Sequence, residues 1–135
     1  MADQRTGARA VGDRTTDDRA IRDQARHDLA RAVALEPQER YRVALSVAVR
    51  AAALVLAERT HPSTIRRGPT GIWVLLARHA PALREWSDFF VLAATRTFGP
   101  RQPPVSEREA DDLLRDAGRF LDVARNLSSP HRSAI

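Results

Sequence analysis

Histidine and arginine are the residues of this sequence with the most evident capacity for chemistry. The 22 basic residues are all arginines, and the four histidines are His27, His61, His79 and His131. An imidazole takes up or releases a proton near neutral pH, and a guanidinium stabilises charge on an anionic group. Two histidines have an arginine five or six positions before them: Arg22 precedes His27, and Arg125 precedes His131. These two pairs are the first candidates for acid–base chemistry.

The composition excludes several other kinds of chemistry. Without cysteine the chain has no disulfide, thiolate nucleophile or cysteine-ligated metal site. The histidines show no metal-ligand spacing, so we predict no metal site and no cofactor. No apolar stretch approaches the ~20 residues of a membrane span, and residues 1–16 do not form a signal peptide. We therefore expect a cytoplasmic protein that does not bind membranes.

The pattern of apolar residues predicts one all-α domain. We assign residues 1–16 to a disordered lead, 17–127 to a helical bundle and 128–135 to a polar tail. Within the bundle, apolar residues recur every three or four positions, and no strand-like alternation is present. The expected fold is an up-and-down bundle of four helices, or of five if Pro81 divides one of them.

Breaker and capping residues set the helix boundaries. The first helix is expected to begin near Asp17, and Pro37 ends it and opens a second helix, which is apolar almost all round over residues 43–57. The segment 61–71 is a predicted loop. The helical stretch that follows is expected to close at Phe98–Pro104, and a capping box of Ser106 and Glu109 begins the last helix.

Several short motifs follow one another in an order that resembles a known family. They are Arg40-Tyr41, Trp73-x-Leu75-Leu76, Pro81-x-Leu83-x-Glu85-Trp86-x-x-Phe89-Phe90, Ser106-x-Arg108-Glu109-Ala110-Asp111-Asp112-Leu113 and Phe120-Leu121. Over residues 17–127 the chain thus resembles small stand-alone HEPN-domain proteins of high-GC bacteria, where HEPN stands for "higher eukaryotes and prokaryotes nucleotide-binding".

The resemblance implies a helical bundle, often a homodimer, in a superfamily that includes many metal-independent RNA endonucleases. Those enzymes cleave with an arginine followed, after four to six residues, by a histidine. Arg125 and His131 are the matching pair in the later part of this chain. However, 22 arginines in 135 residues give about two such pairs by chance, and two are found. Arg22 and His27 also lie on different faces of a helix.

Arg50 is the single charge in the apolar stretch 43–57 and needs a carboxylate partner if it is buried. We consider Glu85, Asp111 and Asp112 as partners that would fix the helix register. Alternatively, Arg50 lines a pocket for a nucleotide phosphate or base.

The remaining candidates also have two interpretations each. Trp86, beside Glu85, either belongs to the core with Trp73 or presents a stacking surface for bases. Asp111 and Asp112 either cap a helix or contribute to a ligand site. Arg66 and Arg67 either form a basic loop or bind a phosphate at a helix N-terminus.

We therefore predict a HEPN-like bundle that associates with RNA or a nucleotide and lacks a convincing cleaving pair. Two alternatives stay open. The chain could be a metal-independent endoribonuclease, or a dimeric bundle that binds a protein partner without binding nucleic acid.

Overall fold

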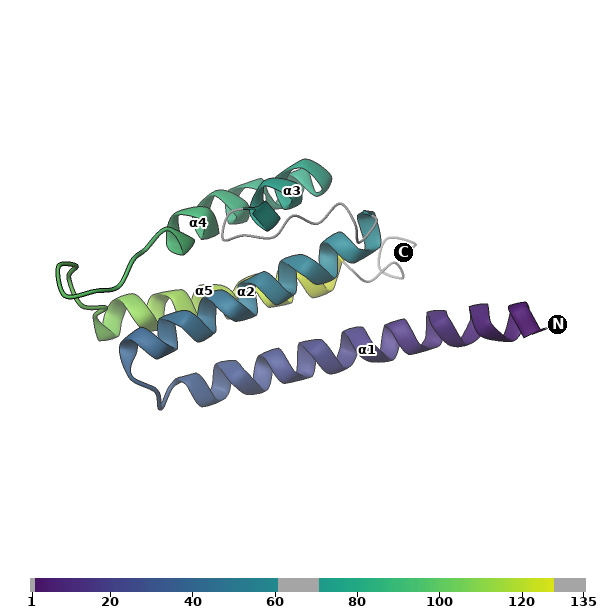
Figure 1. The fold of residues 1–135 in the computed structure, drawn as a ribbon, viewed down its shortest axis with the longest axis horizontal. Coiled ribbons are helices and arrows are strands. Elements are labelled where there is room, and N and C mark those ends of the chain that lie inside the picture. The colour runs from purple at the N-terminus through teal and green to yellow at the C-terminus, as the bar shows by residue number, and fades with distance from the viewer. Residues whose placement is uncertain (1, 61–70, 128–135) are drawn as a thin grey trace.

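The computed structural model describes residues 2–60 and 71–127, with side chains from Thr16 onward. Over these residues the chain forms five α-helices, one short 3-10 turn and no strand. The elements are α1 (Ala2–Ala32), α2 (Pro37–Arg59), α3 (Gly71–His79), the 3-10 turn η2 (Pro81–Leu83), α4 (Arg84–Ala94) and α5 (Glu107–Leu127). Figure 1 shows α1 antiparallel to α2, α3 and α4 returning along the other side, and α5 running beside α2. The predicted all-α bundle is confirmed.

The centre of the bundle is the packing of α2 against α5, which are parallel. Small side chains allow this close approach, since the alanines of α2 at positions 44, 48, 51 and 52 are fully buried. Val49 is exposed on the same helix, so α2 is buried over a wide face rather than all round. α1 covers one side of this pair through the buried Ala25 and Ala32.

An aromatic cluster joins α3 and α4 to α5 on the other side. Trp73 stacks on Phe90 with ring centroids 4.9 Å apart, and Phe120 lies 5.2 Å from Phe90. All three side chains are fully buried. Because large aromatic side chains contribute strongly to core stability, this cluster holds the α3–α4 arm on the bundle.

The first helix differs from the expected one. α1 begins at Ala2, so it includes most of the lead assigned to residues 1–16, rather than starting near Asp17. No proline interrupts residues 2–36, and Gly7 and Gly12 each cost a helix only about 1 kcal/mol. Figure 1 shows the N-terminal part of α1 extending past the end of α2. The tail assigned to 128–135 lies outside the described residues.

The breaker residues act largely as predicted. α2 carries Pro37 at its first turn, and Pro81 separates α3 from α4. At the start of α5, the Glu109 N–H donates to Ser106 Oγ at 3.0 Å, which is the backbone half of the expected capping box. α4 ends at Ala94, four residues before the expected position, and the Thr95 hydroxyl donates to the Leu92 carbonyl there.

Candidate functional site

Arg40 is the buried arginine of this fold, with only 6% of the residue exposed. Its Nη1 donates to Glu107 Oε2 at 2.7 Å and to Asp111 Oδ1 at 2.8 Å. Both acids lie in the first turns of α5, four residues apart and therefore on one helix face. The hydrogen bond to Glu107 raises the pKa of Arg40, so its charge is secure.

The other side of the same guanidinium closes the connection between α1 and α2. Arg40 Nε donates to the Ala32 carbonyl at 3.2 Å, and Nη2 donates to the carbonyls of Val33 at 3.1 Å and Leu35 at 2.8 Å. The last carbonyls of a helix have no partner within it. All five N–H groups of Arg40 are thus used, and the residue joins three segments of the chain.

Arg50 does not have the partner that the sequence suggested. It lies half-exposed on α2, and its Nη2 is 2.9 Å from Asp28 Oδ2 on α1. The hydrogen bonds from Gln24 and then Arg50 lower the pKa of Asp28. The expectation of an acid from Glu85, Asp111 or Asp112 was therefore wrong for Arg50.

The parallel arrangement of α2 and α5 explains this correction. It places the acids that begin α5 beside Arg40 at the start of α2. Arg50 lies ten residues further along α2, or about 15 Å at 1.5 Å per residue. Sequence reasoning found Asp111 as the acid of a buried pair but assigned it the wrong arginine.

A second arginine joins the loop between α4 and α5. Arg96 Nε donates to Glu109 Oε2 at 2.9 Å, and its Nη2 donates to the Pro103 carbonyl at 2.8 Å. The bond from Arg96 lowers the pKa of Glu109. The Arg42 guanidinium of α2 lies 5.0 Å from the ring centroid of Phe98 in the same loop. Arg42 and Arg96 thus attach the α4–α5 loop to the helices beside it.

Tyr41 connects this end to α4. Its hydroxyl donates to the Ala93 carbonyl at 2.7 Å, and burial raises its pKa. Arg40 and Tyr41 are consecutive residues of α2 that bind different helices. Arg40 binds α5, and Tyr41 binds α4. The Arg40-Tyr41 motif has a structural role.

The acidic residues at the start of α5 are occupied by arginines. Asp111 accepts from Arg40, and Asp112 pairs with Arg115 on the same helix. Residues 2–60 and 71–127 contain no group of three or more histidines and acids that could hold a metal ion. Of the acids at the start of α5, Glu107 and Asp111 connect this helix to α2, and Asp112 pairs within α5.

The tryptophans belong to the core. Trp73 is fully buried, and Trp86 is half-buried and stacks on Phe90 at 6.0 Å between centroids. A surface for base stacking needs an exposed ring face, which Trp73 lacks. Glu85 is exposed and makes no ion pair with another described residue.

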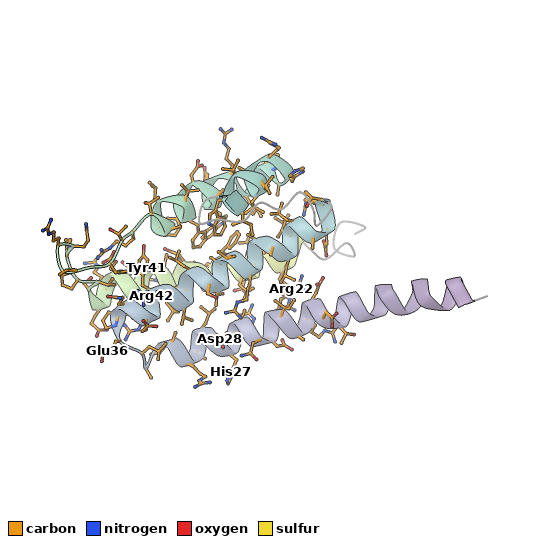
Figure 2. The ribbon with its side chains drawn as sticks, viewed as in Figure 1. Arg22, His27, Asp28, Glu36, Tyr41 and Arg42 are labelled. Atoms are coloured by element: carbon orange, nitrogen blue, oxygen red, sulfur yellow. The ribbon has the colours of Figure 1, made fainter. Side chains whose placement is uncertain are left out.

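The two Arg–His pairs have different outcomes. On α1, Arg22 lies on the side towards α2, whereas His27 points outward from the bundle, as Figure 2 shows. They therefore form no joint site. Arg125 is exposed in the last turn of α5. Its companion His131 lies outside the described residues, as do Arg66 and Arg67.

The end of the bundle where α2 and α5 terminate contains arginines from three helices. Arg59 and Arg125 end α2 and α5 and are exposed, and neither makes an ion pair with a described residue. Burial, followed by the nearby Asp18, raises the pKa of Glu58, although Arg22 of α1 and Arg59 both lie close enough to favour its charged form. Sequence reasoning did not single out Arg59, whose position in the last turn of a helix was the available signal.

The protein is a small helical bundle. Where α2 and α5 begin, hydrogen bonds from Arg40 and Tyr41 connect these two helices with α4. A family model, the SAV_6107-like HEPN family, matches residues 30–125, and the chain belongs to that family. The match includes the Arg40-Tyr41 motif and the acidic start of α5. No curated protein and no solved structure gives a significant match. No helix in the described part of the chain is long and apolar enough to cross a membrane.

Proposed function

We propose that this protein associates with RNA or a nucleotide through the end of the bundle where α2 and α5 terminate. The observation that carries the proposal is the contrast between its arginines. Arg40 and Arg96 form salt bridges with acids of the fold, whereas Arg59 and Arg125 are exposed and form no salt bridge with a described residue, although Glu58 lies near enough to attract Arg59. Membership of a family named for nucleotide binding supports the same conclusion. Unpaired guanidiniums attract phosphate.

Further basic residues follow both helices in the sequence. Arg66 and Arg67 follow α2 in the sequence, and His131 and Arg132 follow α5. The net charge of +5 lets these groups raise the local concentration of a polyanion. The homodimer expected for the family stays a prediction.

A gel-shift experiment with labelled single-stranded RNA tests the proposal. We expect a retarded band that weakens with salt, and further in an Arg59→Gln/Arg125→Gln variant, whose salt dependence falls by about one unit per lost phosphate contact. The matched control is Arg101→Gln/Arg108→Gln, which removes the same charge from exposed positions at the opposite end. Equal loss in both variants, or no retarded band, contradicts the proposal.

The same RNA on a denaturing gel separates binding from cleavage. We expect intact RNA, with and without a chelator. Shortened RNA that persists in chelator and disappears in His131→Ala would instead establish the metal-independent endoribonuclease with Arg125 and His131, because a histidine is the proton-transfer group in that chemistry.

A further inference from the structure

Two large apolar side chains of α4 are exposed on one helix face. Phe89 is 39% exposed and Leu92 is 72% exposed, and they lie three residues apart, on adjacent turns of the same face. They line a groove of about 600 Å³ between α4 and α5, which we name the α4–α5 groove. Its residues are Tyr41, Phe89, Leu92, Ala93, Thr95, Arg96, Glu109, Asp112, Leu113 and Asp116.

The wall formed by α5 is acidic. Arg96 neutralises Glu109 and closes one end of the groove. Asp112 pairs with Arg108 and Arg115, and Asp116 pairs with Arg119; these arginines belong to α5 itself and do not line the groove. Such intrahelical surface pairs contribute little and exchange readily for another cation.

A further acid lies on α4 just beyond the residues that line the groove. Glu85 is exposed one turn before Phe89, on the face of α4 that carries Phe89. It makes no ion pair within the described residues. The α4–α5 groove is therefore apolar at its centre and negative at its edges, on a chain whose net charge is +5. A solvent-exposed apolar groove with one sign of charge at its rim has the character of a binding surface.

We propose that the α4–α5 groove binds an amphipathic helix of another protein, one that carries a stripe of apolar residues flanked by arginine or lysine. The apolar stripe would contact Phe89 and Leu92, as in other helix-in-groove complexes. The flanking cations would pair with Asp112 and Asp116 and take the place of the intrahelical arginines. This surface is separate from the end of the bundle where α2 and α5 terminate, which is the end proposed to contact RNA.

Charge favours such a partner over a second copy of this chain. A second copy that inserted its own α4 would bring its Glu85 towards Asp112 and Asp116. Like charges placed opposite one another oppose association and act against the wrong partner. The groove thus selects a basic helix rather than the acidic face of its own α4.

A designed peptide tests the proposal with the full-length protein. The probe is a fluorescein-labelled helical peptide with leucines at positions i, i+3, i+4 and i+7 and arginines beside them. The control peptide has the same leucines and glutamates in place of the arginines. We expect the arginine peptide to bind with saturable anisotropy and the glutamate peptide to bind at least about tenfold more weakly.

Variants locate the binding site. We expect Leu92→Ser, and separately Asp112→Asn/Asp116→Asn, to weaken binding of the arginine peptide about tenfold or more. The matched control is Val74→Ser, which removes another exposed apolar side chain, 55% exposed, from α3. Circular dichroism of each variant verifies the fold.

Three results of the peptide experiments would overturn the proposal. They are no saturable binding of the arginine peptide, equal binding of the two peptides, and equal weakening by Val74→Ser and Leu92→Ser. A fourth is a wild-type dimer in light scattering that Leu92→Ser converts to a monomer, because a second copy would then occupy the groove. RNA binding is measured on the same variants, so failure of either proposal is seen independently of the other.

Discussion

The Nη1 atom of Arg40 lies 2.8 Å from Oδ1 of Asp111, which joins the first turn of α2 to the first turns of α5. The arginine is buried, whereas the carboxylates of Asp111 and Glu107 remain more than half exposed. Burial costs the guanidinium its hydration, which opposes the interaction, but every one of its donors has an acceptor and the acids keep much of their own hydration. This connection holds both parallel helices in one register.

Arg40→Met is expected to destabilise the protein strongly. The change removes five hydrogen bonds and leaves the carbonyls of Val33 and Leu35 without the guanidinium that donates to them, while the Ala32 carbonyl keeps only the Leu35 N–H. We expect thermal unfolding followed by circular dichroism to give a melting temperature lower by more than about 5 °C.

Two further variants serve as comparison for Arg40. Arg40→Lys should rescue little, because an ammonium cannot reproduce the planar fork of five donors. Arg42→Met removes an exposed pair with Glu39 and the contact of its guanidinium with Phe98, each worth about 1 kcal/mol or less, and should lower the melting temperature by less than Arg40→Met does. Equal shifts for Arg40→Met and Arg42→Met would show that the buried connection does not hold the bundle.

Ser87→Ala is expected to leave the stability unchanged or to raise it. Ser87 is 2% exposed, and its hydroxyl has no hydrogen-bond partner in the described part of the chain. Burying an unpaired hydroxyl costs free energy, and alanine favours a helix more than serine does, so the gain should be about 0.5–1 kcal/mol. Urea unfolding measures the change. A clear destabilisation would mean that the hydroxyl has a partner, for example a buried water molecule.

The sequence predicted the helices and the core well. Pro37, Pro81 and the Ser106–Glu109 cap act locally, through backbone geometry, and each lies at the boundary that was expected. The apolar period likewise identified Phe90 and Phe120 as core residues. Local rules of this kind need no knowledge of the tertiary arrangement.

The candidate sites were harder to predict because they depend on which helices run in parallel. Arg50 stood out in an apolar stretch, yet Asp28 on the neighbouring α1 reaches it at the edge of α2. Arg40 lies beside polar residues in the sequence and gives no signal of burial. The groove beside Leu92 was also missed, since an exposed leucine on an amphipathic helix resembles a core residue until its neighbours are known.

Tyr41→Phe is expected to cost about 1 kcal/mol, because it removes the hydrogen bond from the hydroxyl to the Ala93 carbonyl while keeping the ring in place. The raised pKa of Tyr41 gives the change a dependence on pH. The folded state favours the protonated phenol, so this contribution is complete below the ordinary pKa of tyrosine and declines as the pH rises through the folded value.

Urea unfolding of the wild type and Tyr41→Phe at pH 7 and at alkaline pH tests this expectation. The difference in free energy of unfolding should be smaller at alkaline pH, where the phenol has ionised in the unfolded chain. A difference that grows with pH would mean that the folded state favours the ionised phenol, contrary to its burial.

Glu109→Gln is expected to reduce stability near neutral pH and to matter less in acid. Arg96 donates to both carboxylate oxygens, at 2.9 and 3.3 Å, and lowers the pKa of Glu109 below its ordinary value. Above that ordinary value the carboxylate is ionised in both states and the pair stabilises the fold. As the pH falls, the unfolded chain takes up the proton first, so the stabilisation declines and is lost once the pH passes the folded pKa. The difference between wild type and Glu109→Gln should therefore be full above about pH 5.5 and shrink towards pH 3.

Urea unfolding at a series of pH values, with Glu85→Gln as the control for an exposed unpaired carboxylate, gives the comparison. If the difference stays constant from about pH 6 to pH 3, the ionised Arg96–Glu109 pair is not what holds the α4–α5 loop, and the backbone bond from Glu109 to Ser106 would have to do so.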